Sequence, residues 1–313
     1  MLACRLAVLP RRPGDPLAAR PQQVLGGTLA LLTLASFGVL LSRTLELNGG
    51  AWATLWPDMR LALAVTHFGH VWWWRIPALA MLWLGWGWQT RHHDARWNGW
   101  AMLLAVAAIA LTRSETGHPA DHGDFTLAVW VDWLHILAAG TWVGSLFGMS
   151  LVVFPRLLRT GNAAVKPALG IFQRLSTLSG AALAVLVACG LYNAVTQLDG
   201  FAGLWTTRYG AILDIKLALV LGMTAIGAHN RYVKLPHLRT AASRAAAAGD
   251  SQPRIIRSCA RAVLAESLLG IAVIGATATL LHAMPPADAP VNHAVATASD
   301  RAEWQIAALG AVR

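Results

Sequence analysis

The stretch VDWLHILAAGTWVGSL, residues 131–146, joins a strongly apolar run to two ionisable side chains. At 3.6 residues per turn, one stripe of a helix would hold Asp132, His135, Ala139, Trp142 and Leu146. The length and apolarity of the surrounding segment predict a membrane span. A polar group inside such a span is costly unless it is paired, so His135 is a candidate functional residue.

The composition of the whole chain agrees with this prediction. Of 313 residues, 56% are hydrophobic and 13% are charged, whereas a soluble domain carries roughly 25% charged residues. The three cysteines are far apart and form no CxxC pair, which argues against a disulfide framework or a zinc site. We therefore expect an all-α polytopic membrane bundle. Its apolar runs predict seven spans, at about 24–45, 76–90, 98–112, 128–150, 172–195, 211–229 and 262–282.

The charges are distributed unevenly between the two sides of these spans. Of the 25 Lys and Arg residues, 17 fall on the side of the N-terminus and 8 on the other. The positive-inside rule then places the N-terminus in the cytoplasm and the C-terminus in the periplasm. The net charge of +10 follows from this topology, so we expect lipid and not nucleic acid as the surrounding partner. The expected organisation is a cytoplasmic lead (1–23), a membrane domain (24–286) and a flexible periplasmic tail (287–313).

An internal repeat is indicated by two segments with matching residues. VTHFGHVWWWRIPALAML (65–82) aligns with TTRYGAILDIKLALVLGM (206–223). The flanking spans correspond in the same order, which predicts a parallel repeat. The span that carries His135 has no counterpart at the start of the chain. We therefore expect that the first helix of the first half is missing, through an upstream start codon or a loss.

Histidines near the outer ends of the spans are candidate metal ligands. Imidazole and thioether groups suit copper, and the candidates are His118, His135, His122, His67, His70, His282 and Met284. Asp132, one turn from His135, is placed to orient its ring, with Trp142 as a supporting neighbour.

Each candidate also has a structural interpretation, which stays open. His118 and His122 would be solvated loop residues. His67 and His70 would be interfacial residues within an aromatic belt formed with Trp72, Trp73 and Trp74. His135 would hydrogen-bond to a neighbouring helix. Among the charged residues, Arg75 and Lys216 would snorkel to the interface, and Glu266 would pair with Arg261.

Six segments in this order resemble the copper resistance protein D family of bacterial inner-membrane proteins. They are TGHP (116–119), DWLHILAAGTWVGSL (132–146), CGLYNAV (189–195), TTRYGAILDIKLAL (206–219), GAHNR (227–231) and AESLLGIAVIGATATL (265–280), the last followed by MPP. The resemblance implies an all-helical protein that moves copper across the inner membrane from the periplasmic side. It also implies a periplasmic copper-carrier protein as partner, and it matches His118 and His135 to histidines of the family.

Three functions follow from these observations. The first is a copper permease; the sequence has no ATP-binding loop or aspartyl-phosphate motif, so we expect no enzymatic activity. The second is a membrane electron-transfer protein with haem b, which needs two facing intramembrane histidines. Only His135 lies clearly within a predicted span. The third is a structural subunit without a site.

Overall fold

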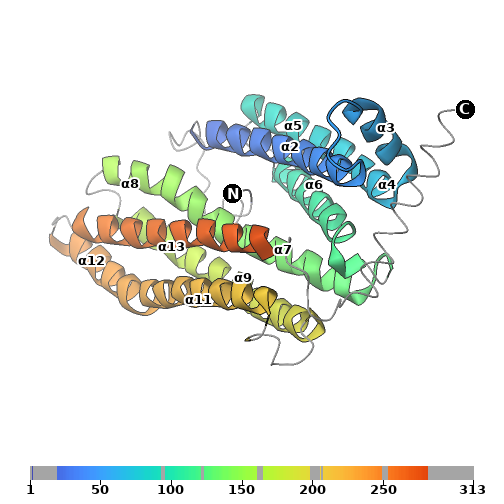
Figure 1. Cartoon of the computed structure of the whole chain (residues 1–313). Coiled ribbons are helices and arrows are strands. Elements are labelled where there is room, and N and C mark those ends of the chain that lie inside the picture. Colours follow the sequence, from blue (N-terminus) through green and yellow to red (C-terminus); the bar gives the residue numbers. More distant parts are fainter. Residues whose placement is uncertain are drawn as a thin grey trace, which may run out of the picture. The chain divides into compact units, whose positions relative to one another are not determined.

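The computed structural model describes residues 2, 20–92, 96–120, 123–160, 165–197, 205, 207–248 and 253–280. The regular structure of these residues is entirely helical, which confirms the expected all-α class (Figure 1). Among them, five helices are long and apolar enough to cross a membrane. The described helices divide between two compact units, one that includes residues 22–133 and one that includes residues 134–280. The predicted lead and tail lie largely outside the described residues.

The N-terminal unit contains three of the predicted spans as helices α2 (Arg20–Leu47), α5 (Arg75–Arg91) and α6 (Arg96–Ser114). Between α2 and α5 the chain forms two short helices that the sequence pattern did not predict, α3 (Leu55–Val65) and α4 (His67–Trp73). The structure also packs α5 against α6 and α4 against α5.

Indole groups attach α4 and α5 to α2. Trp72 is 2% exposed and its Nε1–H donates to the carbonyl of Ser36 over 3.2 Å. Further along, Trp83 and Trp86 donate to Thr33 Oγ1 and to the carbonyl of Gln22. In the aromatic-belt interpretation Trp72 would lie at the membrane interface with Trp73 and Trp74; the structure exposes those two but buries Trp72. Its indole fills the core beside Leu40 and Phe68, because a buried N–H finds an acceptor in the helix behind it.

The C-terminal unit holds the remaining predicted spans. Helix α7 (Leu127–Gly148) begins in the first unit and continues through a π-helical turn, η3 (Met149–Val153), into α8 (Phe154–Thr160). Helix α9 (Val165–Gln197) follows, and then α11 (Arg208–His229). A second π-helical turn, η5 (Asn230–Lys234), leads from α11 into α12 (Leu235–Ala248). Helix α13 (Pro253–Leu280) packs against α11, α8, η3 and η5 (Figure 1).

Both π-helical turns have a proline as their cause. In η3 the N–H of Phe154 bonds to the carbonyl of Met149, and Pro155 follows. In η5 the N–H of Leu235 bonds to the carbonyl of Asn230, and Pro236 follows. A proline offers no N–H to the carbonyl four residues back, and its ring crowds that carbonyl. Widening the preceding turn to the i→i+5 pattern relieves this crowding without ending the helix.

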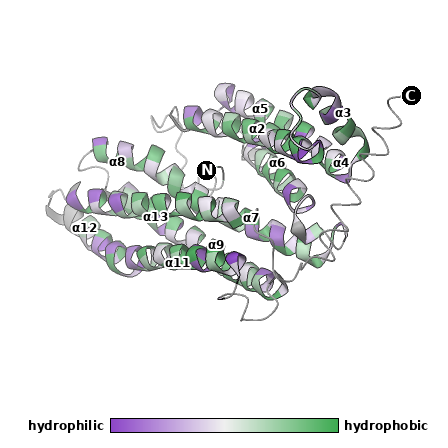
Figure 2. Cartoon of the chain, in the orientation of Figure 1, coloured by the Kyte–Doolittle hydropathy of each residue, from purple (hydrophilic) through white to green (hydrophobic). Residues whose placement is uncertain are grey.

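Apolar side chains on the outer faces of the helices are exposed, as expected for contact with lipid. Leu34, Leu84, Leu191, Leu221 and Ile274 are among the most exposed of these, at 55–74%. Figure 2 shows hydrophobic residues along much of α11 and α13, and hydrophilic residues toward the α12 end of this unit. Because an apolar surface of this extent is unfavourable in water, the fold is that of a multi-pass membrane protein.

All seven predicted spans coincide with helices, although α5 and α6 fall outside the five that meet the length and apolarity required for a crossing. The two segments proposed as a repeat begin in the same way. Thr66 before α4 and Thr207 before α11 are both extended, and each side chain accepts the N–H of the glycine three residues later, Gly69 or Gly210, over 3.0 Å. The count of seven spans and the repeat as a whole stay predictions.

Candidate functional site

Helix α4 holds His67 and His70 at the end of α3, where the backbone approaches closely. The Thr66 hydroxyl accepts the N–H of Gly69 and donates to the carbonyl of Ala62 over 2.7 Å. A Cβ at Gly69 would overlap the backbone of Ala62 and Leu63. Glycine at this position therefore lets α4 rest directly on α3, and this contact fixes where His67 projects.

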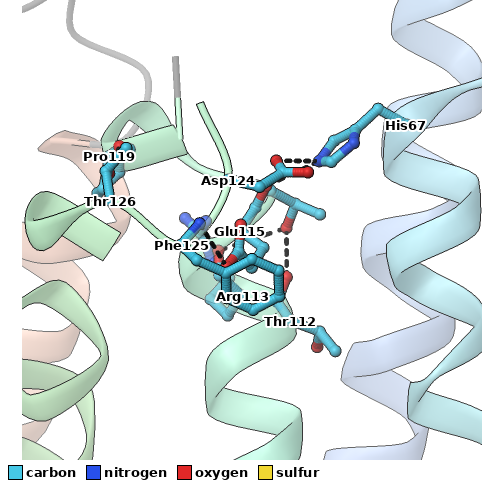
Figure 3. A network of polar contacts seen from close by, with 9 residues as sticks. His67, Thr112, Arg113, Glu115, Pro119, Asp124, Phe125 and Thr126 are labelled. Carbon is cyan, nitrogen blue, oxygen red and sulfur yellow. Dashed lines mark hydrogen bonds and ion pairs between the residues drawn. The ribbon is translucent and has the colours of Figure 1, made fainter. Parts of the chain in front are cut away.

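A polar cluster surrounds His67, which we call the His67 cluster: His67, Glu115, Asp124 and Phe125 (Figure 3). Nε2 of His67 lies 3.4 Å from Oδ1 of Asp124 and 3.4 Å from the carbonyl oxygen of Glu115. The side chains of His67 and Asp124 are half exposed, at 46% and 53%. An imidazole beside a carboxylate, open to solvent, has the donor types that a borderline-soft metal ion accepts.

Glu115 is the buried member of this cluster, and the sequence reasoning missed it. It is 5% exposed, and Oε1 accepts the N–H of Phe125 over 3.2 Å. Its Oε2 is buried and has no hydrogen-bond partner among the described residues. Burial raises the pKa of this carboxyl and the Phe125 N–H lowers it, while Asp124 raises it and His67 lowers it. The only sequence signal was a glutamate directly after the predicted span, beside TGHP.

The loop that brings Asp124 to His67 requires an unusual backbone. Phe125 has a φ of 55°, in the left-handed region that few residues other than glycine adopt, and Gly123 has a φ of 119°. The strain at Phe125 is offset by its hydrogen bond to Glu115 and by the start of α7, where Thr126 Oγ1 accepts the N–H of Val129. The buried carboxylate thus holds the loop that carries Asp124.

His70 has a separate environment from His67. Its Nε2 lies 3.1 Å from the carbonyl oxygen of Ala64, near the end of α3. The two histidines are one turn apart on α4, but their Nε2 atoms have different partners. The Nε2 atoms of these two candidate ligands therefore lie against different carbonyl groups.

His135 lies on α7 against α9. Its Cε1 is 3.6 Å, and its Nδ1 3.9 Å, from the position that a Cβ on Gly190 would take. The neighbouring Cys189 is buried, and so is Trp142, at 4% exposed. The imidazole therefore packs against the α9 backbone at Gly190, within the C-terminal unit.

Asp132, predicted to orient His135, has a partner on α6. Its Oδ2 accepts the hydroxyl of Ser114 over 2.7 Å, and Ser114 is fully buried. This contact ties α7 to the end of α6 in the N-terminal unit. The proposed role of Asp132 toward His135 stays a prediction.

Two charged residues differ from their predicted roles. Arg75 does not snorkel: it is 2% exposed, and its Nε donates to Thr112 Oγ1 over 2.7 Å. The hydroxyl and carbonyl of Thr112 at the end of α6 make burial of this guanidinium possible. Glu266 accepts a hydrogen bond from Asn230 rather than pairing with Arg261, which is exposed.

The remaining candidate ligands lie outside what the structure describes. His122, His282 and Met284 are beyond the described residues, and of His118 only the backbone, at the start of η2 (His118–Ala120), is described. Within the described residues, no three His, Cys, Asp or Glu side chains gather closely enough to hold a metal ion. The structure therefore describes the side chains of His67, His70 and His135, and the whole predicted ligand set stays a prediction.

The chain is a multi-pass α-helical membrane protein. Its packed helices have exposed apolar surfaces, and histidines lie within or at the ends of some of them. A family model described as Copper resistance protein D matches residues 169–280. A second, described as Copper resistance protein D-like, N-terminal domain, matches residues 1–126. The two together account for most of the sequence, and the chain belongs to the copper resistance protein D family.

Three curated relatives are similar to this chain, and two of them have names that refer to copper. Copper resistance protein D of Pseudomonas syringae pv. tomato is 26% identical over 89% of this chain and 88% of its own length. Inner membrane protein YebZ of Escherichia coli (strain K12) is 28% identical over 70% of this chain and 75% of its own length. Copper transport protein CutJ of Bacillus subtilis (strain 168) is 26% identical over 74% of this chain, which spans only 43% of that relative. No solved structure matches the chain.

Proposed function

We propose that this protein carries copper across the bacterial inner membrane, taking the ion from the periplasmic side. The observation that carries this proposal is the placement of His67, half exposed beside a carboxylate at a helix end, in a chain whose relatives are named for copper. Imidazole nitrogen is a ligand that copper accepts readily. Metal binding at His67 would displace any proton from Nε2, so binding and proton release are linked at this position.

We assign the capture of copper and its passage through the bundle to different parts of the chain. The His67 cluster, with His118, His122, His282 and Met284 as further proposed ligands, would collect the ion at the periplasmic ends of the helices. His135, on α7 against Gly190, would receive it within the bundle. Several weak sites in succession would allow the ion to leave as well as to enter.

The proposed orientation rests on the distribution of Lys and Arg. It places the N-terminus in the cytoplasm and the C-terminus in the periplasm. The partners that this arrangement calls for are membrane lipid and a periplasmic protein that delivers copper. Transport of this kind involves no chemical transformation, so we propose no enzymatic activity.

The test compares copper accumulation in cells with and without the gene. His135→Ala should abolish the difference while the amount of membrane-inserted protein is unchanged. His229→Ala is the matched control, because it removes an exposed imidazole at the end of α11. Wild-type copper accumulation in His135→Ala cells would contradict the role given to His135.

The capture step has its own measurement. Joint replacement of His118, His122, His282 and Met284 should weaken copper uptake chiefly at low external copper, because high copper compensates for weak binding. A loss seen only at saturating copper would assign these residues to a later step.

The haem alternative receives no support from the family or from the names of the relatives reported above. The absorption spectrum of the purified protein tests it directly. A Soret band would establish haem and contradict the copper proposal as stated.

A further inference from the structure

A buried polar cluster lies where the two π-helical turns meet α13, and copper capture does not use it. Asn230, the first residue of η5, donates from Nδ2 to Oε2 of Glu266 over 2.9 Å. Ser150, in η3, lies with its hydroxyl 3.0 Å from the hydroxyl of Ser267. Each proline-induced turn therefore presents one polar side chain to one of two consecutive residues of α13.

Glu266 is enclosed by protein at this point. It is 4% exposed, Asn230 is 5% exposed, and Oε1 of Glu266 lies 3.0 Å from the position of a Cβ on Gly227. Glu266 is the single charged residue between Ala262 and Leu280. It lies only about one helical turn from Arg261, where the apolar stretch of α13 begins, so it is near the boundary of the hydrocarbon region.

The positive charge that acts on Glu266 is that of Lys234 in η5, whose Nζ donates to the carbonyl of Ser258. The guanidinium of Arg231, also in η5, donates instead to the carbonyl and the hydroxyl of Ser176 on α9. Among the described side chains, the other ionisable groups on α13 and on the elements packed against it are the buried Cys189, Tyr209 and Cys259, the half-buried Arg156, Tyr192, Asp214 and Lys216, and the exposed Arg159, Arg174, Arg208, His229, Tyr232, His237, Arg239, Arg254, Arg257 and Arg261. Within the described residues, the carboxyl of Glu266 therefore has the carboxamide of Asn230 as its hydrogen-bond partner and the charge of Lys234 acting on it.

The carboxamide of Asn230 can satisfy Glu266 in either protonation state. Its Nδ2 donates to the ionised carboxylate, as the structure shows. Its Oδ1 is buried and has no hydrogen-bond partner among the described residues. After a half-turn of the amide, Oδ1 would accept the O–H of the protonated acid. The two side chains therefore keep one hydrogen bond between them whether the carboxyl is ionised or protonated, so the carboxyl itself has a partner in both states.

We propose that Glu266 is a proton-binding site inside the membrane, exchanging its proton with the nearby aqueous phase while Asn230 pairs with both forms of the carboxyl. The site has oxygen donors and no imidazole or thioether within its described contacts, so its chemistry differs from that of a copper site. An ionisable residue in a membrane helix, held by a polar partner within the bundle, is the arrangement found in proton relays.

Infrared difference spectroscopy of the purified protein in lipid vesicles, titrated in pH without copper, tests this proposal. We expect a protonated carboxylic C=O band that disappears on deprotonation and is absent from Glu266→Gln. Asn230→Leu should move the midpoint of that titration by about 1 pH unit or more, because a hydrogen bond to a charged group is lost. Glu46→Gln is the matched control, since it removes an exposed carboxyl bonded to Arg43, and it should leave the band unchanged.

Persistence of the same titrating band in Glu266→Gln would overturn the proposal, as would a Glu266 carboxyl that stays ionised at every pH tested. If Glu266→Gln does not fold, Glu266→Asp retains the acid on a shorter side chain and should shift the frequency of the band. An unshifted band in Glu266→Asp would likewise overturn the proposal. The measurement uses no copper, so its outcome is independent of the proposed transport function.

Discussion

Gly190 offers a graded steric test of the role of His135. A Cβ at this position would lie 3.6 Å from Cε1 of the imidazole, an ordinary van der Waals separation. Gly190→Ala should therefore leave copper accumulation close to wild type. Gly190→Leu adds three further carbons in the direction of the ring, and overpacking of this kind costs about 1–3 kcal/mol. If the imidazole moves aside to relieve that cost, its original position is depopulated by about 5- to 150-fold.

The assay is cellular copper accumulation at equal amounts of membrane-inserted protein. We expect Gly190→Leu to resemble His135→Ala, and Gly190→Ala to resemble wild type. Gly170→Leu is the matched control on the same helix, because a Cβ at Gly170 meets no atom within 4 Å among the described residues. Full copper accumulation by Gly190→Leu would refute the reasoning, since the ion would then pass without the imidazole in its present place.

Three further outcomes follow from the N-terminal unit. His67→Ala should reduce copper uptake at low external copper and have little effect at high copper; an equal loss at all concentrations would place His67 beyond the capture step. Gly69→Ala should lower the stability of the detergent-purified protein to heat by more than about 1 kcal/mol, because its Cβ would overlap backbone atoms. Gly38→Ala is the control, since a Cβ at Gly38 meets no atom within 4 Å in the described structure. Arg75→Met should cost about 1.5–3 kcal/mol through the loss of its hydrogen bonds to Thr112, and an unchanged melting temperature would show that this guanidinium contributes no net stability.

The positions of the long helices were predictable because the length and apolarity of a segment indicate a membrane span without any tertiary information. The helices at 128–150 and 211–229, for example, could be predicted without knowledge of tertiary contacts. The short helices α3 and α4 were missed because two turns of helix between spans leave no long periodic pattern. Their formation depends on Thr66 as a cap and on Gly69 as a point of close approach.

The polar residues of the site were harder to predict than the spans. His135 stood out because a polar side chain inside a predicted span is costly unless it is paired, and His67 because it lies near the outer end of one. Glu115 did not, because a glutamate at a span end is usually solvated, and only the fold of the following loop buries it. Arg75 was likewise expected to reach water, because it lies near the end of a predicted span. Burial of these charges depends on partners that are distant in sequence, which periodicity does not report.

The proline positions carried information that the sequence analysis did not use. Pro155 and Pro236 each follow a span, where a proline commonly ends a helix. Here the helix continues through a wider turn, so each span extends into α8 or α12. A single sequence distinguishes these outcomes poorly, because the choice depends on whether α13 is present to receive the side chains of the widened turn.

The π-helical turns change the rotational register of the helices that follow them. One additional residue in a helix advances the chain by about 100° around its axis. The face of α8 that meets α13 is therefore rotated from the face that an unbroken continuation of α7 would have presented. Shortening η3 by one residue would return Pro155 to a regular α-helical turn, where its ring crowds the carbonyl four residues earlier, and would rotate every later side chain of that helix away from α13. A single-residue deletion at this point should consequently be more damaging than most substitutions in the same helix.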